Sequence, residues 1–395
     1  MPVWLLILPP LVLLAGLIVL MLRTGPADAL KPAGVPPVER LAITRVELGS
    51  EGFVVTVLND GPDPVSIAQV QVDDAYWQFS SSHGNPLGHL QRATLAIPYP
   101  WVEGEAHIVK LVTSTGTTFE REIPVAFETP RPGARNFAVF ALIGLYVGVI
   151  PVAIGLLWFP MVARLGGRGL DFVLALTVGL LVFLMVDASA EGIETAQALP
   201  GSYQGMALLV FAAGAAYVGL EALGAWLKRS RTAVKNAHPG AVLALLIAIG
   251  IGLHNFGEGL AIGAAFALGE TVLGSLLIMG FALHNTTEGL AIVAPLAREA
   301  AASSRRVPIL ALVRLGVIGG APTIAGAWLG GFVYSQVWAL LFLGLGIGAI
   351  AQVTGQILGQ MAGGKPLGGY LASGPVLAGL LAGFVVMYTT GMLIG

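Results

Sequence analysis

The chain has 395 residues, of which 56% are hydrophobic and only 11% are charged, and its mean hydropathy is +0.83. Soluble domains carry roughly 25% charged residues, so this composition indicates an integral membrane protein. The formal net charge of −2 and the lack of a basic stripe exclude a nucleic-acid partner. Cysteine is absent, which excludes disulfides and thiolate metal sites.

The first apolar segment covers residues 3–22 and carries no charge. Its length suits a membrane helix of about 20 residues. The small residues at Ala27–Ala29 resemble a signal-peptide cleavage site, but no basic residues precede the apolar run. We therefore favour a retained anchor helix over residues 1–22, with a cleaved signal peptide as the alternative. A Pro-rich linker follows over residues 23–38.

Residues 39–128 have a different character and predict a small extracytoplasmic β-sandwich domain. Short runs such as FVVTVLND from Phe53 and AHIVKLVTS from Ala106 alternate apolar with polar residues and are bounded by Gly, Pro, Asn and Asp. This pattern is typical of the short strands of a sandwich. A linker over residues 129–135 then leads into the membrane.

Three histidines of this domain, His83, His89 and His107, are candidate metal ligands. The six-residue spacing of the first two can hold a metal, but nothing in the sequence fixes a third ligand. We therefore interpret them as turn and loop residues. The pair Asp73–Asp74 is interpreted in the same way, as a solvated turn.

Residues 136–395 contain eight apolar spans that are long enough to cross a bilayer. The spans lie at about 136–160, 170–196, 203–227, 240–267, 271–297, 307–331, 335–360 and 373–394. Lys and Arg occur in the loops after the first, third, fifth and seventh spans and are absent from the other loops. The positive-inside rule makes the charged loops cytoplasmic. We therefore expect a multi-pass protein of the plasma (inner) membrane, with the β-domain and the C-terminus extracytoplasmic.

Two polar motifs interrupt the apolar spans: LHNFGEGLAI from Leu253 in the fourth span and LHNTTEGLAI from Leu283 in the fifth. In each motif the His and the Glu are four residues apart and share one helix face. His254 and His284 both lie near the centre of their spans, and the two spans are consecutive and antiparallel. The two His–Glu pairs can therefore face each other near the bilayer midplane.

Glu258 and Glu288 cannot both stay ionised side by side in a low dielectric without a cation. A lone intramembrane His or Glu is more simply explained as an interhelical hydrogen bond, but two imidazoles and two carboxylates at one depth favour a metal. These ligands suit Zn²⁺ and its borderline neighbours, and ionisable residues inside membranes mark ion pathways. The sequence therefore predicts a divalent-metal site on the fourth and fifth spans.

Eight spans with H-N-x-x-E-G on the fourth and again on the fifth resemble the ZIP (Zrt/Irt-like) family of divalent-metal transporters, over about residues 136–395. The resemblance implies a bundle in which spans 1–3 and 6–8 are inverted halves around spans 4 and 5. It implies alternating-access passage of Zn²⁺ toward the cytoplasm, with Fe²⁺, Mn²⁺ and Cd²⁺ as further candidate substrates, no cofactor and no enzymatic activity. The metal ligands that it implies are His254, Asn255, Glu258, His284, Asn285 and Glu288.

The sequence departs from the family pattern at positions that bear on the site. Gly257 and Thr287 replace the usual Pro before each Glu, so the bend of each helix is left open. The Glu that many members carry on the seventh span aligns with Gln356, and Gln352 lies one turn earlier. We expect these amides to be at most outer-shell partners, so that two Glu side chains balance a single divalent ion.

The second span ends in an acidic stripe, in which Asp187, Glu191 and Glu194 are spaced i, i+4, i+7. We interpret the stripe as an entry funnel that concentrates cations; the alternative is an ordinary helix end solvated by water. Glu221, near the inner end of the third span, either lines the exit or pairs with a loop Arg.

Two other functions are kept as alternatives. An intramembrane zinc hydrolase is one, because His and Glu can also activate water, but the sequence lacks H-E-x-x-H. A metal-sensing receptor is the other, but the cytoplasmic loops are too short to hold a signalling domain. No Walker A sequence is present, so ATP does not drive transport from this chain. The expected partners are the divalent ion and the lipid bilayer, and a homodimer is left open.

Overall fold

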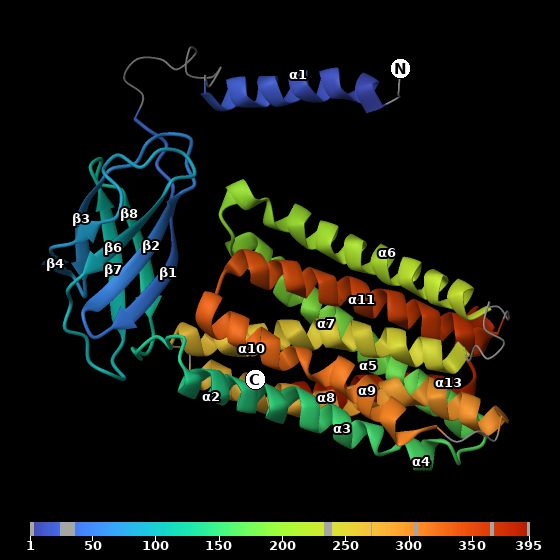
Figure 1. Cartoon of the computed structure of the whole chain (residues 1–395). Helices are drawn as coiled ribbons and strands as arrows, with labels where there is room; N and C mark the ends of the chain where they lie inside the picture. Colours follow the sequence, from blue (N-terminus) through green and yellow to red (C-terminus); the bar gives the residue numbers. More distant parts are fainter. Residues whose placement is uncertain are drawn as a thin grey trace.

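A computed structural model describes residues 4–23, 36–232, 239–269, 271–303, 307–363 and 367–392. A small β-unit, residues 41–129, lies beside one end of a bundle of long helices (Figure 1). Most of the predicted linker over residues 23–38 falls outside the described residues.

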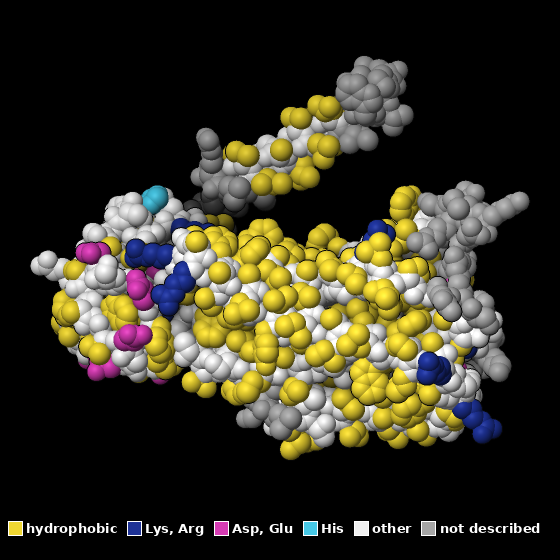
Figure 2. Space-filling view, turned by 60° about the horizontal axis from the view of Figure 1, so that its bottom comes forward, with side chains coloured by type: hydrophobic (Ala, Val, Ile, Leu, Met, Phe, Trp, Pro, Cys, Tyr) yellow, Lys and Arg dark blue, Asp and Glu magenta, His cyan; other side chains and the backbone are white. Residues whose placement is uncertain are grey.

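The N-terminal apolar run forms a helix, α1 (Trp4–Arg23). The helix lies apart from the bundle (Figure 1, Figure 2). Its described apolar stretch, Leu8–Leu20, is shorter than the long helices of the bundle. The extent of α1 agrees with the predicted anchor, whose retention or cleavage stays a prediction.

Two four-stranded antiparallel sheets form the β-unit, with strand orders β1-β2-β6-β5 and β4-β3-β7-β8. Apolar residues that alternate along the strands meet in one shared core, which includes Phe53, Val55, Leu95 and Leu111. Two sheets that enclose one core are the arrangement expected of a sandwich. The strands are β1 (Leu41–Gly49), β2 (Gly52–Asn59), β3 (Ile67–Val72), β4 (Ala75–Trp77), β5 (Ser80–Ser81), β6 (Arg92–Ile97), β7 (His107–Thr113) and β8 (Thr118–Ile123).

The described residues contain eight helical segments long and apolar enough to cross a membrane, so the predicted number of spans is confirmed. Figure 2 shows hydrophobic side chains covering the middle of the bundle, while charged side chains lie on the β-unit and at the opposite end. The segments are Ala134–Val162, Gly167–Ala198, Gly201–Leu227, Pro239–Ala267, Thr271–Ala302, Ile309–Val333, Gln336–Ala362 and Gly374–Met392.

The first and sixth spans are broken, whereas the other spans consist mainly of one long helix each. In the sixth span α9 (Ile309–Gly320) ends before Pro322, where α10 (Pro322–Val333) begins, because proline has no N–H to continue the helical hydrogen bonds. The first span contains α2 (Ala134–Gly144), a π-helical turn (Leu145–Val149), α3 (Ile150–Leu156) and α4 (Phe159–Val162). The remaining helices are α5 (Gly167–Ala198), α6 (Gly205–Thr232), α7 (Pro239–Ala267), α8 (Thr271–Ser303), α9 (Ile309–Gly320), α10 (Pro322–Val333), α11 (Gln336–Ala362), α12 (Leu367–Leu371) and α13 (Gly374–Met392).

The fourth span, α7, is the most enclosed helix of the bundle. Of its most apolar window, 67% is buried, against 22% for the corresponding windows of the third and eighth spans. Its side chains join those of α5, α8 and α11 in the main core, through residues such as Ile247, Ile251, Leu181 and Ile292. Polar residues on α7 are therefore shielded from the surroundings of the bundle by other helices.

Candidate metal centre

The fourth and fifth spans form a hairpin that carries both polar motifs. In the turn between α7 and α8, Gly269 has a φ of +79°, a backbone conformation that favours glycine. A Cβ added to this residue would lie 2.6 Å from the backbone oxygen of Val125. The tip of the hairpin therefore packs closely against the end of the β-unit.

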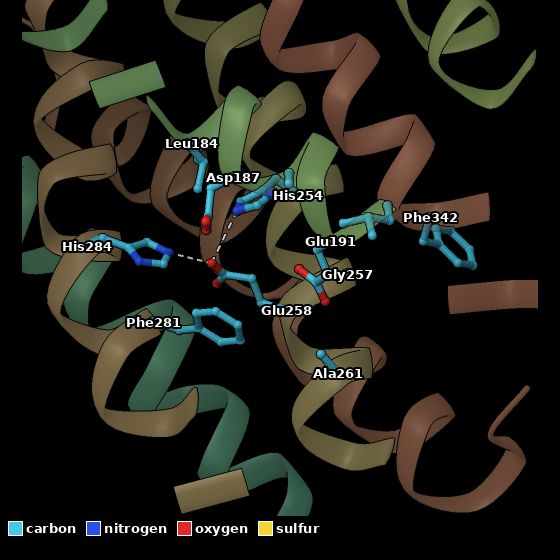
Figure 3. Close-up of a pocket in the computed structure, with 12 residues that line it drawn as sticks. Leu184, Asp187, Glu191, His254, Gly257, Glu258, Ala261, Phe281, His284 and Phe342 are labelled. Carbon is cyan, nitrogen blue, oxygen red and sulfur yellow. Dashed lines mark hydrogen bonds and ion pairs between the residues drawn. The ribbon is translucent and has the colours of Figure 1, made fainter. Parts of the chain in front are cut away.

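Three side chains from the hairpin converge inside the bundle (Figure 3). His284 Nε2 lies 2.5 Å from Glu258 Oε1 and His254 Nε2 lies 3.2 Å from the same oxygen. One ligand atom from each of the three residues lies within 4.8 Å of the other two. All three side chains are at most 8% exposed. The structure thus brings the two motifs together, with Glu258 at the centre.

Asn255 and Asn285 anchor the hairpin to the two broken spans. Asn285 Nδ2 donates to Glu258 Oε2 at 2.9 Å and to the backbone oxygen of Val147 at 3.1 Å. Asn255 Nδ2 donates to the backbone oxygen of Gly319 at 3.0 Å. The amide oxygen of each Asn is buried and has no hydrogen-bond partner among the described residues. Each Asn therefore positions its helix and retains an acceptor oxygen.

Glu288 lies outside this three-residue group. Its side chain is buried, and within the described residues neither carboxylate oxygen meets full hydrogen-bond geometry, although the amide of Asn255 lies close enough to interact with the carboxylate. It lies close enough to Glu258 and His254 to interact with both electrostatically. An unpaired buried carboxylate costs several kcal/mol, so Glu288 marks the place where a nearby cation would stabilise the site most.

The glycine after each motif Glu lets the hairpin approach the broken spans. A Cβ on Gly259 would lie 2.1 Å from the backbone oxygen of Thr323 in α10. A Cβ on Gly289 would lie 2.2 Å from the backbone oxygen of Val152 in α3. Any side chain at either position would push the helices apart. In each motif the Glu is thus a candidate metal ligand, and the Gly after it allows the close helix packing that keeps the Glu in place.

Gly257 and Thr287, which replace the expected prolines, leave both helices continuous through the site. Thr287 Oγ1 donates to the backbone oxygen of His284 at 2.6 Å, which satisfies the hydroxyl within its own helix. A Cβ on Gly257 would meet no atom within 4 Å. Gly257 therefore faces open space next to Glu258.

Two cavities that share lining residues lie between the cluster and the end of the bundle that carries the β-unit. The inner cavity has a volume of about 40 Å³ and is lined by the three clustered side chains, by Asp187 and by aromatic residues (Figure 3). The second cavity, of about 240 Å³, extends to Tyr334. Glu191 and Gly257 line both cavities. The inner cavity is large enough to admit water or a small ion.

The three acids of the stripe on α5 differ in whether they line the cavities. All three acids are exposed, but only Asp187 and Glu191 line the inner cavity, and Glu194 lines neither cavity. In Figure 3 the carboxylate of Asp187 points toward the cluster, and Glu191 lies on the other side of Glu258. Only Asp187 and Glu191 therefore lie where the predicted entry funnel requires them, and the funnel itself stays a prediction.

Gln352 and Gln356 on α11 do not reach the cluster. Gln352 Nε2 donates to Glu221 Oε2 of α6 at 2.9 Å, and Gln356 lines a separate cavity at the N-terminal end of α7. Their placement gives no support to the outer-shell role expected from the sequence. α11 instead approaches the cluster at Gly346, where an added Cβ would lie 3.3 Å from the Cα of His254.

Several parts of the site were missed by sequence reasoning. Val147 and Gly319 contribute backbone oxygens, and a backbone acceptor leaves no mark on residue type. Val147 lies in the π-helical turn of the first span, a feature that is frequent at functional sites. Phe281 and Phe342 line the inner cavity, but an aromatic residue in an apolar span is indistinguishable from one that faces lipid.

Within the described residues the histidines of the β-unit form no metal group. His89 Nδ1 lies 2.7 Å from the backbone oxygen of Gly61, and His107 Nδ1 lies 2.7 Å from Asp73 Oδ2. Asp73 is more than a solvated turn residue, because it also accepts a hydrogen bond from the Tyr99 hydroxyl at 2.8 Å. Burial alone would raise the pKa of Asp73, but hydrogen bonds from the backbone, His107 and Tyr99 hold it below its ordinary value.

No protein-family model matches the sequence, and no curated protein matches it. Function is therefore inferred from the residues and their geometry.

Proposed function

We propose that the protein is a secondary transporter that moves Zn²⁺, or a related divalent transition metal, across a membrane toward the cytoplasm. The observation that carries this proposal is the buried group of His254, Glu258 and His284, which lies within a bundle of eight apolar spans and lines a cavity. Ionisable residues inside a membrane are costly and mark ion pathways. The metal is then the substrate of the protein rather than a resident cofactor.

The donor atoms favour zinc and its neighbours. Zn²⁺ binds imidazole nitrogen and carboxylate oxygen at about 2.0–2.2 Å, which places two ligands of a tetrahedral ion roughly 3.3 Å apart. His254 Nε2 and Glu258 Oε1, at 3.2 Å, already have this spacing. His284 Nε2, at 2.5 Å from the same oxygen, needs to move by roughly 0.8 Å. Glu288 is the best candidate for a fourth ligand, and two carboxylates balance the charge of one divalent ion.

The distribution of charge supports entry from the side of the β-unit. Helix α4, the start of α5 and the C-terminal ends of α6 and α8 lie at the end of the bundle opposite the β-unit (Figure 1). The sequence at these places carries Arg164, Arg168, Arg229 and Arg298. The positive-inside rule makes that end cytoplasmic. The two cavities then lead inward from the external side, and Asp187 and Glu191 attract cations toward the cluster. Alternating access would release the ion at the opposite end.

The contacts of the two motifs support a ZIP-like arrangement with inverted halves. On α7, Asn255 and Gly259 contact the sixth span, whereas on α8, Asn285 and Gly289 contact the first span. The same two motif positions thus make equivalent contacts with spans 6 and 1, which correspond to each other in an inverted repeat of spans 1–3 and 6–8. Both of these spans are also broken helices.

Metal uptake into proteoliposomes tests the proposal. Purified full-length protein is reconstituted, Zn²⁺, Mn²⁺, Fe²⁺, Cd²⁺ or Mg²⁺ is added outside, and a trapped fluorescent indicator reports the ion that enters. We expect saturable Zn²⁺ uptake and no Mg²⁺ uptake, because Mg²⁺ prefers an all-oxygen octahedral shell. His284→Ala should abolish uptake, whereas Glu221→Gln, which alters a membrane carboxylate outside the cluster, should not. If folded wild-type protein transports none of these metals, the proposal is wrong; wild-type uptake by His284→Ala would refute the site.

A further inference from the structure

A carboxylate on the β-unit fastens it to the helix bundle. Asp60 accepts hydrogen bonds from the backbone N–H groups of Gly201 and Ser202, at 2.8 and 3.0 Å, in the turn between α5 and α6. Burial alone would raise the pKa of Asp60, but hydrogen bonds from this turn and the charge of Arg40 hold it below its ordinary value of 3.8. The carboxylate is therefore ionised at neutral pH, and the contact fixes the position of the β-unit.

A cavity of about 230 Å³, called here the seam cavity, lies between the β-unit and the bundle. One wall comes from β1, β2 and β6, and the other comes from residues 199–203 and residues 334–337. No Asp or Glu is among the described residues that line it. Figure 2 shows Lys and Arg side chains on the β-unit where it meets the bundle. The polar side chains that matter here are Arg45, Thr56, Arg92, Tyr203, Ser335 and Gln336.

Arg92 gives the seam cavity a positive charge that no carboxylate among the described residues balances. Arg45 is paired with Glu47 at 2.7 Å, whereas the partner of Arg92 among the described residues is the neutral hydroxyl of Tyr203. A guanidinium has five N–H donors, so most of those on Arg92 remain available. The Tyr203 hydroxyl accepts from Arg92 and keeps its own proton to donate. The hydroxyl of Ser335 makes no capping hydrogen bond to α11 and adds a further donor.

We propose that the seam cavity binds an oxyanion of the phosphate class. Guanidinium groups bind phosphate oxygens through paired N–H donors, and the surrounding hydroxyl groups supply further donors. Leu199, Pro200 and Val337 form an apolar side of the same cavity, which suits a phosphate that carries an organic group. The phosphate comes either from solution or from a phospholipid headgroup, because the cavity lies where the spans reach the end of the bundle. This site is separate from the metal cluster and does not depend on metal transport.

A ligand in the seam cavity would hold the β-unit and the bundle together. A bound phosphate would contact the β-unit and two separate turns of the bundle at once, and would therefore add to the contact made by Asp60. Tyr334 lines both the seam cavity and the larger cavity that leads toward the cluster. Occupation of the seam cavity thus acts on a wall of the proposed entry route.

Direct binding tests the proposal with the full-length protein. Equilibrium dialysis measures ³²P-labelled inorganic phosphate, and native mass spectrometry measures phosphatidylglycerol retained from mixed nanodiscs against phosphatidylcholine. We expect wild type to bind one of these probes, and Arg92→Gln to bind it about tenfold or more weakly, as for the loss of a hydrogen bond to a charged group. Arg92→Lys should be intermediate, because lysine keeps the charge and loses the paired donors. The control Arg121→Gln, on β8 and outside the seam cavity, should bind as wild type does.

A second measurement keeps the test independent of the folding of the Arg92 variants. The chain has no cysteine, so Ser335→Cys introduces a single thiol into the seam cavity. Inorganic phosphate or phosphatidylglycerol should slow its labelling by a methanethiosulfonate reagent, and Arg92→Gln in the same background should remove this protection. Protection by phosphate identifies a soluble ligand, and protection by phosphatidylglycerol alone identifies a lipid. If wild type binds neither probe, or if Arg92→Gln binds and protects as wild type does, the proposal is overturned.

Discussion

Replacing Glu258 with Gln should weaken Zn²⁺ binding more than any other carboxylate substitution in the bundle. Glu258 Oε1 is in contact with both histidines, at 3.2 Å from His254 and 2.5 Å from His284, and Oε2 accepts a hydrogen bond from Asn285. Gln has nearly the same shape but no charge. Its amide also places N–H donors where an imidazole and an Asn amide already donate, so the substitution removes a ligand and introduces donor–donor conflict.

The expected loss follows from the burial of these groups. Removing one partner from a buried charge pair costs about 3–5 kcal/mol, which corresponds to roughly a hundred- to several-thousand-fold in dissociation constant. Glu288→Gln removes the candidate fourth ligand but leaves the three-residue group complete, so we expect a smaller loss of Zn²⁺ affinity, about 10- to 100-fold, or roughly 1.4–2.8 kcal/mol. Glu221→Gln should leave affinity unchanged, because Glu221 bonds Gln352 and not the cluster.

Isothermal titration calorimetry of the purified variants with Zn²⁺ measures these differences, with circular dichroism and gel filtration as checks of folding. A folded Glu258→Gln protein that binds Zn²⁺ within about tenfold of wild type would refute a site centred on Glu258. A larger loss in Glu288→Gln than in Glu258→Gln would move that centre to Glu288.

Four further predictions follow from the structure. Zn²⁺ affinity should fall as pH drops from about 7 to 5, since protons compete with the metal for imidazole nitrogen and carboxylate oxygen; calorimetry that finds no pH dependence would exclude histidine ligands. Gly257→Leu should fill the passage between the two cavities and abolish most uptake, whereas Gly214→Leu, at another helical glycine with open space, should not; equal uptake would place the route elsewhere. Asp60→Asn should loosen the β-unit, seen as faster proteolysis of the linker 129–135. Wild type should show the same faster proteolysis only below about pH 4. The folded-state pKa of Asp60 is depressed, so its stabilising contact is complete above the unfolded-state pKa and is lost as pH falls through the folded-state value. A proteolysis rate that stays constant down to about pH 3 would contradict this role of Asp60. Deleting residues 33–130 while keeping α1 should leave transport itself intact, because the eight spans contain the proposed path, and loss of uptake by a correctly inserted protein would show that the β-unit takes part.

Much of this architecture follows from local patterns. Long apolar runs separated by short loops predict the eight spans, since hydropathy is a property of a segment and does not depend on its neighbours. Alternation likewise locates β2 (Gly52–Asn59) and β7 (His107–Thr113) within one or two residues of the observed bounds. The facing of His254 and His284 is predictable as well, because two consecutive antiparallel helices with polar residues at their centres bring those centres to one depth.

Other features were decided by the packing of the helices. Spacing places Glu258 and Glu288 at equivalent positions, and only the rotation of each helix against its neighbours puts Glu258 between the two histidines and leaves Glu288 outside the three-residue group. The same rotation turns Gln352 toward α6, although its sequence position suggests the site.

Sequence alone therefore indicated that the protein has membrane-spanning segments, how many there are, and which residue types meet at their centre. Each of these depends on composition and on spacing along one chain segment. Tertiary structure decided which carboxylate bridges the histidines, that the two Asn side chains bond to backbone oxygens of broken spans, and that the β-unit meets the bundle through Asp60 and Arg92. The contacts of the two Asn side chains with the broken spans, and those of Asp60 and Arg92, join residues more than 60 positions apart, and most of them end on backbone atoms. Their existence depends on how whole helices and sheets lie against one another, which no local pattern of side chains encodes.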